Sequence, residues 1–174
     1  MLRTSLAIAL VSAALQGGQA SAQAFYDAAI CKPPYTMSSA MALYDAAEKL
    51  AKPDTSLLTA NVYKLPQDIG QDGFKTDEVV FAGTSIGVLV QGAQAEALAK
   101  RYQLERERST LLGASTKGYA RELPADQQPQ PEGGTVSIIA RESAALPGKT
   151  LLACEFVSKA DRAALEAYER SKGR

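Results

Sequence analysis

Apolar residues recur at helical spacing in three segments of the chain, and each segment predicts a helix. The first spans 37–52 and stops at Pro53, the second runs from Ala95 to about Leu104, and the third follows Ser158. Ser158 and Asp161 have the spacing of a capping box at the start of the third helix. The apolar stripes are formed by Met37, Met41, Tyr44, Ala47 and Leu50 in the first helix, and by Ala164, Leu165 and Tyr168 in the third.

Alternating or continuous apolar runs predict five strands, at 57–65, 78–82, 86–90, 135–142 and 149–157. Gly83-Thr84-Ser85 separates the second run from the third and predicts a hairpin turn whose second arm is buried on both faces. In the last run, adjacent apolar residues at 151–154 predict a central strand.

The order of these elements predicts an α+β fold. Most strands are joined by links of hairpin length, whereas a parallel, doubly wound sheet needs a helix between nearly every strand pair. We therefore expect one domain over residues 23–174, with a mostly antiparallel sheet of about five strands packed against two to three helices.

Four segments lack a clear period. Pro33-Pro34 predicts an extended lead-in over 23–36, and polar residues predict a surface loop over 67–77. The stretch 105–123 fits either a continued helix plus loop or an irregular strand pair, and this choice stays open. Residues 124–134 are rich in proline and glutamine and predict a solvated loop.

The first two dozen residues have the pattern of a secretory signal peptide. Arg3 precedes an apolar run over 6–15, and small residues follow at the spacing of a cleavage site. Cleavage after Ala22 or after Ala24 satisfies this spacing, and we favour Ala22, which makes 1–22 the signal peptide. The protein is therefore expected in the periplasm or secreted.

The apolar run is about half of the ~20 residues that a membrane-spanning helix needs. No other stretch of the chain is long enough either, so no integral membrane segment is expected after cleavage. Removing 22 of the 174 residues leaves 152, including 18 basic and 19 acidic residues. A net charge near −1 provides no strong field for nucleic acid, and nucleic-acid binding is disfavoured.

The chain has two cysteines, Cys31 and Cys154. An isolated pair in an oxidising compartment is usually a disulfide, which predicts a bond between them. Because it would close a loop of more than 100 residues, the chain-entropy model gives a stabilisation of about 4 to 5 kcal/mol.

The chain contains no histidine, and this absence removes the usual general base, the usual activator of Ser or Cys nucleophiles and the commonest metal ligand. Residues 83–87 match the G-x-S-x-G nucleophile elbow, but a strand pattern rather than a helix follows, so a hairpin turn is favoured. Ser115 and Lys117 lie two apart, and Ser-x-x-Lys does not occur.

A cation site is weakly suggested around Asp68, Asp72 and Asp77, with Gly73 at the turn position of a calcium loop. The pattern fails at Gly70 and Val79, where ligands belong. We therefore expect no catalytic residues, metal or cofactor.

These exclusions favour a non-catalytic exported protein that binds another protein, such as an envelope component, or that acts as an inhibitor or immunity-type factor. The loops at 66–77 and 124–134 are the expected contact surfaces. The alternative is a small-molecule or lipid binder with an apolar pocket under the first helix, lined by Met37, Met41 and Tyr44. A histidine-free hydrolase using Ser85 or Ser115 is the least favoured hypothesis.

Overall fold

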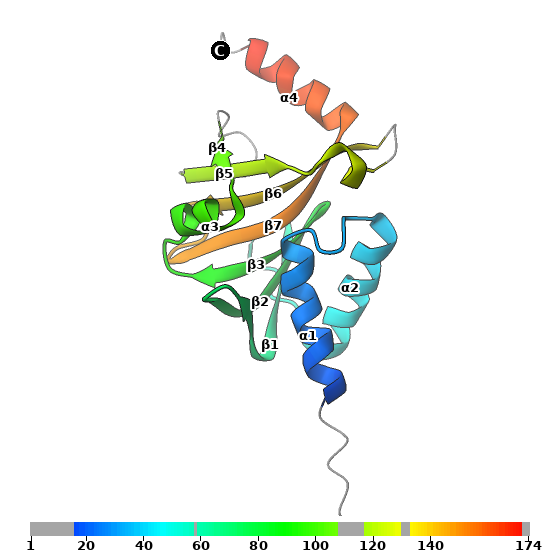
Figure 1. Ribbon diagram of the computed structural model, residues 1–174, viewed down its shortest axis with the longest axis vertical. Coiled ribbons are helices and arrows are strands. Elements are labelled where there is room, and N and C mark those ends of the chain that lie inside the picture. The colour runs from blue at the N-terminus through cyan, green and yellow to red at the C-terminus, as the bar shows by residue number, and fades with distance from the viewer. Residues whose placement is uncertain (1–15, 58, 108–116, 130–132, 172–174) are drawn as a thin grey trace, which may run out of the picture.

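The fold is built on an antiparallel sheet, as the computed structural model in Figure 1 shows. In the described residues this sheet has seven strands. The structure describes residues 16–57, 59–107, 117–129 and 133–171. The strands are β1 (Ala60–Gln71), β2 (Phe74–Ala82), β3 (Ser85–Gln91), β4 (Glu105–Arg106), β5 (Lys117–Glu122), β6 (Gly134–Glu142) and β7 (Lys149–Ser158). Their order is β1-β2-β3-β7-β6-β5-β4, which confirms the prediction that the last strand is central.

Helices in the described residues are α1 (Gln16–Ala29), α2 (Met37–Leu50), α3 (Ala95–Tyr102) and α4 (Lys159–Ser171), and a 3₁₀ turn spans Ala125–Gln127. The α+β class is confirmed, but the predicted counts of five strands and two to three helices are too low. Within the part of the chain that the structure describes, no helix is long and apolar enough to cross a bilayer.

The main hydrophobic core lies between one face of the sheet and the helices α1 to α3. Phe25 and Tyr26 of α1 and Leu98 of α3 pack in one cluster with Val88 of β3 and Leu152 of β7. A smaller cluster of Val62, Val80 and Leu89 occupies the opposite face, because successive strand residues point to opposite sides.

The extended lead-in predicted over 23–36 is wrong for residues 23–29, which belong to α1. Pro33-Pro34 stops the helix from continuing into α2, and the Lys32–Pro33 peptide is cis. Phe25, Tyr26 and Ala29 have no exposed surface, so a segment that the sequence assigned to an extended lead-in contributes to the core.

The loop predicted over 67–77 is also wrong, whereas the use of 66–77 as a contact surface stays a prediction. β1 continues past Pro66 to Gln71, and Asp72-Gly73 forms a tight turn into β2 with positive φ at both residues, 60° and 90°. An Asp-Gly pair is a strong hairpin signal. The register shift between Lys64 and Ile69 accommodates Pro66 on the outer strand of the sheet.

The predicted disulfide is confirmed: Cys31 is bonded to Cys154 across a sequence separation of 123 residues. Both cysteines are buried. The bond ties the segment after α1 to the central strand β7.

The final helix begins as expected and then departs from the prediction. Ser158 Oγ accepts a hydrogen bond from the Asp161 N–H at 3.1 Å, which confirms the cap. No residue of α4 is buried, and Tyr168 is 49% exposed, so the predicted inner face is wrong. Figure 1 shows α4 extending away from the sheet beyond the end of β7.

The stretch that the sequence left open, 105–123, contains a strand pair in its described residues. β4 pairs with β5 through Glu105 and Ala120 and through Arg106 and Tyr119. Residues 108–116, which include Ser115, lie outside the described residues.

Candidate binding groove

The start of α2 is fixed by a capping box at Thr36. Thr36 Oγ1 accepts from the Ser39 N–H at 3.1 Å, and the Thr36 N–H donates to Ser39 Oγ at 3.2 Å. Because residues four apart lie above one another on a helix, this start places Met37 and Met41 on the same face in the first two turns.

The predicted apolar stripe of α2 is only partly an inner face. Ala47 is fully buried, and the Tyr44 ring packs edge to face against Tyr63 and Phe81, with centroids 5.9 and 5.3 Å apart. By contrast, Met37 is 55% exposed and Met41 is 53% exposed. The small and aromatic residues therefore attach α2 to the sheet, while the methionines face solvent.

A cavity of about 300 Å³ lies between α2 and the turn that joins β2 to β3. It brings together the three residues predicted for an apolar pocket, Met37, Met41 and Tyr44. Asn61 Nδ2 donates a hydrogen bond of 2.9 Å to the Tyr44 hydroxyl, so the apolar wall carries a polar group. Ligand binding at this cavity stays a prediction.

A second cavity of about 440 Å³ lies beside the first. Tyr35 and Met37 line both cavities. The far wall of the second includes Pro129 and Phe156, and the Tyr35 ring stacks on Phe156 with centroids 5.8 Å apart and planes within 1°. We call the two cavities together the Met37 groove. It runs from Met41 on α2 to Pro129.

The wall at 124–129 is held in place by the side chain of Gln128. Its Nε2 donates to the carbonyls of Leu123 and Val136 at 2.7 and 3.1 Å, and its Oε1 accepts from the Val136 N–H at 2.7 Å. A side-chain amide thus supplies the donor and acceptor that a neighbouring strand would give to β6. Residues 124–129 of the predicted solvated loop at 124–134 are therefore anchored to β6 and lie next to the groove.

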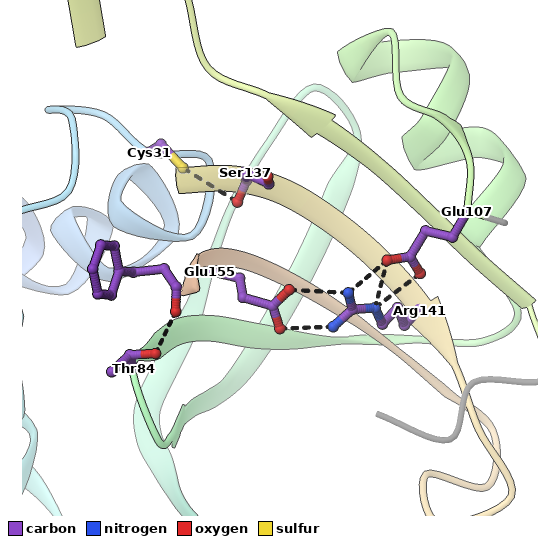
Figure 2. A network of polar contacts seen from close by, with 7 residues as sticks. Cys31, Thr84, Glu107, Ser137, Arg141 and Glu155 are labelled. Atoms are coloured by element: carbon purple, nitrogen blue, oxygen red, sulfur yellow. Dashed lines mark hydrogen bonds and ion pairs between the residues drawn. The ribbon is translucent and has the colours of Figure 1, made fainter. Parts of the chain in front are cut away.

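The G-x-S-x-G segment forms the predicted hairpin turn. Gly83 has a φ of 57°, Ser85 is the first residue of β3, and the two strands pair directly across the turn. Thr84 Oγ1 donates to the Phe156 carbonyl, which links the turn to β7 (Figure 2). Ser85 lines the first cavity of the groove, but the chain has no histidine to activate it.

The weak cation pattern is not assembled as a loop, since its residues lie on the β1–β2 hairpin. Asp72 pairs with Arg101, and hydrogen bonds from that guanidinium hold the pKa of the Asp72 carboxyl below its ordinary value. Asp77 lies 3.4 Å from the ammonium of Lys64. Two of the three carboxylates therefore have basic partners on the protein itself.

A buried charge cluster lies on the sheet face opposite α1, where Arg141 of β6 is held between two carboxylates (Figure 2). Its Nη2 lies 2.6 Å from Glu107 Oε1, and its Nη1 lies 2.7 Å from Glu155 Oε1. The three side chains are 6%, 13% and 15% exposed. Burial opposes the charge of Arg141, but its hydrogen bonds to both glutamates raise its pKa overall.

This cluster forms the floor of a cavity of about 550 Å³ that α4 borders through Arg162 and Leu165. Arg162 pairs with Glu122 at 3.0 Å, so it ties α4 to β5. Since these charges are paired within the protein, the cluster is best explained as an ionic link between β6, β7 and the residue after β4. The Met37 groove, with exposed methionines, is the better candidate for recognition.

Comparisons with protein-family models, with curated proteins and with solved structures find no match for this chain. The function therefore has to be argued from the groove itself. Sequence reasoning identified Met37, Met41 and Tyr44 but missed Tyr35, Gln128 and Phe156. These three residues meet only through tertiary contacts, and no local pattern marks them.

Proposed function

We propose that this chain is an exported protein that acts without catalysis by binding another protein, and that the Met37 groove receives an extended, apolar segment of that partner. An envelope component, or the target of an inhibitor or immunity-type factor, fits this proposal. The observation that carries it is the joining of two cavities at Tyr35 and Met37, with Met37 and Met41 more than half exposed.

The shape of the groove supports a polypeptide over a compact ligand. Small-molecule pockets usually bury most of the ligand surface, whereas here two adjoining hollows follow α2 and the 124–129 segment. Methionine side chains are flexible and polarisable and suit apolar partner surfaces. Asn61 and Thr84 beside them offer polar groups for the partner's main chain.

Export is supported by the signal-peptide pattern at 1–22 and by the disulfide between Cys31 and Cys154. The near-zero net charge supports a protein partner rather than nucleic acid.

The test is affinity capture of the protein with a C-terminal tag from its native host, with a matched pair of variants. Met41→Asp places a charge in the groove, while Leu50→Asp places the same charge on the same helix at a residue that is also exposed, 46% against 53%, and lines neither cavity. A partner that is lost with Met41→Asp and retained with Leu50→Asp supports the proposal. A partner retained by both variants, or no partner at all, contradicts it.

The second candidate is a small apolar molecule or lipid in the cavity under α2. The observation that favours it is a hollow of about 300 Å³ that combines apolar walls with a few polar groups, among them the Asn61–Tyr44 hydrogen bond. A thermal-shift screen with lipids and hydrophobic dyes tests this candidate, because binding to the native state raises the melting temperature. A shift that Met41→Asp removes favours it, and no shift across the panel counts against it.

A further inference from the structure

A cavity of about 370 Å³ lies between the ends of α1 and α3, the tip of the β1–β2 hairpin and β5. It brings together three basic residues that are far apart in the sequence, namely Lys32 just after α1, Arg101 on α3 and Arg121 on β5. Of the lining residues that the structure describes, Asp72 alone is acidic. The cavity that α4 borders has the opposite balance, with five glutamates against three arginines. We call the cavity at Lys32, Arg101 and Arg121 the basic cavity.

Two of its three basic side chains have no carboxylate partner in the described part of the chain. Arg101 pairs with Asp72, which also accepts a hydrogen bond from the Tyr102 hydroxyl at 3.3 Å. Arg121 donates from Nε to the Tyr102 carbonyl at 3.1 Å, and its two Nη groups form no hydrogen bond within the described ranges. Lys32 is exposed and forms no ion pair with these residues either. Donors of Lys32 and Arg121 are therefore available to a ligand.

Helix dipoles explain part of the positive charge at this place. The C-terminal ends of α1 and α3 border the basic cavity, and each carries about half a negative charge, which stabilises cations beside it. Three cations against Asp72 and two helix ends leave an excess of about one positive charge. A carboxylate carries one negative charge, whereas a phosphate monoester carries about 1.5 to 2 at neutral pH. This balance favours a single carboxylate.

Part of the wall of the basic cavity is apolar. Ile30, Leu123 and Ile138 line it, and all three belong to the main hydrophobic core. Sites for small molecules combine apolar walls with a few polar groups, and a volume of about 370 Å³ is within their usual range. An apolar group on the ligand can therefore lie against these side chains while its carboxylate meets the basic residues.

We propose that the basic cavity binds a small monocarboxylate with a short apolar chain or ring, and that Arg121 and Lys32 hold its carboxylate. The planar guanidinium of Arg121 can donate two parallel hydrogen bonds to a carboxylate. The ammonium of Lys32 adds a second charge from a flexible side chain at the exposed side. The proposal depends neither on export nor on the Met37 groove.

The experiment is a ¹H–¹⁵N NMR titration of the disulfide-bonded protein with hexanoate at constant ionic strength. Hexanol and hexylammonium are the matched ligands, because they keep the apolar chain and replace the carboxylate. We expect hexanoate to bind about tenfold more tightly than hexanol, since hexanol lacks the charge-assisted hydrogen bonds, and we expect no binding of hexylammonium. Absence of shifts at millimolar hexanoate, or equal affinities for hexanoate and hexanol, overturns the proposal. Tighter binding of hexyl phosphate overturns the choice of a carboxylate.

Substitutions of the two available cations locate the site. We expect Arg121→Met to weaken hexanoate binding about tenfold. Lys32→Met should weaken it about two- to fivefold, because its charge is exposed, whereas Lys52→Met removes an exposed charge outside the cavity and should change nothing. The comparison of Lys32→Met with Lys52→Met decides the question if Arg121→Met does not fold. Unchanged affinity in the cavity variants overturns the proposal, and so does a loss of binding in Met41→Asp, which would place hexanoate in the Met37 groove.

Discussion

At the scale of single residues, the close contact between β3 and β7 depends on Gly87. Gly87 pairs with Ala153 across the two strands. A Cβ atom added to Gly87 would lie 2.7 Å from Ala153 Cβ and 2.7 Å from the Leu152 carbonyl oxygen. One of the two contacting groups is backbone, which a side-chain rotation does not relieve. The centre of the sheet therefore needs a residue without a side chain here.

We predict that Gly87→Ala lowers the free energy of unfolding by about 1 to 3 kcal/mol, the usual cost of overpacking a well-packed interior. Urea denaturation followed by circular dichroism measures it. The double variant Gly87→Ala with Ala153→Gly removes one of the two clashes, so it should recover part of the loss. A single variant as stable as the parent protein would show that β3 and β7 separate without cost.

Single residues with a local signal were predictable, and residues whose role depends on distant neighbours were not. The disulfide was predictable from the cysteine count and the expected compartment. The hairpin turn before Ser85 was predictable from the glycine between two apolar runs. The exposure of Met37 and Met41 did not follow, because helical spacing defines a face but not what covers it. That outcome depends on where Tyr44 meets Tyr63 and Phe81, which lie on β1 and β2.

At the scale of elements, the sequence predicted α2, α3 and the strands with clear periodicity. It missed α1 because the signal-peptide pattern and Pro33-Pro34 predicted an export signal followed by an extended segment. Phe25 and Tyr26 of this helix are nevertheless core residues. It shortened β1 at Pro66, a residue that an outer strand tolerates. It gave α4 an inner face from an amphipathic pattern, which does not show whether the helix docks.

The 124–129 segment is held against β6 by the side chain of Gln128, which forms hydrogen bonds that a neighbouring strand would otherwise form. We predict that Gln128→Ala lowers the free energy of unfolding by about 1 to 3 kcal/mol, since the Val136 N–H and the Leu123 carbonyl lose the bonds to Gln128 while the Val136 carbonyl keeps the Leu123 N–H at 3.0 Å. Thermal and chemical denaturation measure the change. Gln127→Ala is the matched control, because Gln127 is the exposed neighbour in the same segment. Equal stability of the two variants would refute the anchoring role of Gln128.

At the scale of the whole molecule, the disulfide organises the fold because it joins the chain just after α1 to the middle of the sheet. The loop that it closes includes α2, α3 and the strands from β1 to β6, whereas α4 lies outside it. Two walls of the Met37 groove, formed by residues 34–41 and by residues 124–129, lie inside this loop. Cross-linking thus restrains the unfolded forms of almost every element that shapes the groove.

We predict that reduction of the Cys31–Cys154 bond lowers the free energy of unfolding by about 4 to 5 kcal/mol, the chain-entropy value for a loop of this length and an upper estimate. Guanidinium denaturation with and without reductant measures it, with Cys31→Ser/Cys154→Ser as the reductant-insensitive comparison. Because α4 lies outside the loop, limited proteolysis should cut α4 at the same rate in both states while the sheet becomes susceptible only after reduction. An unchanged denaturation midpoint would mean that the core of α1 and β7 holds the chain ends together without the bond.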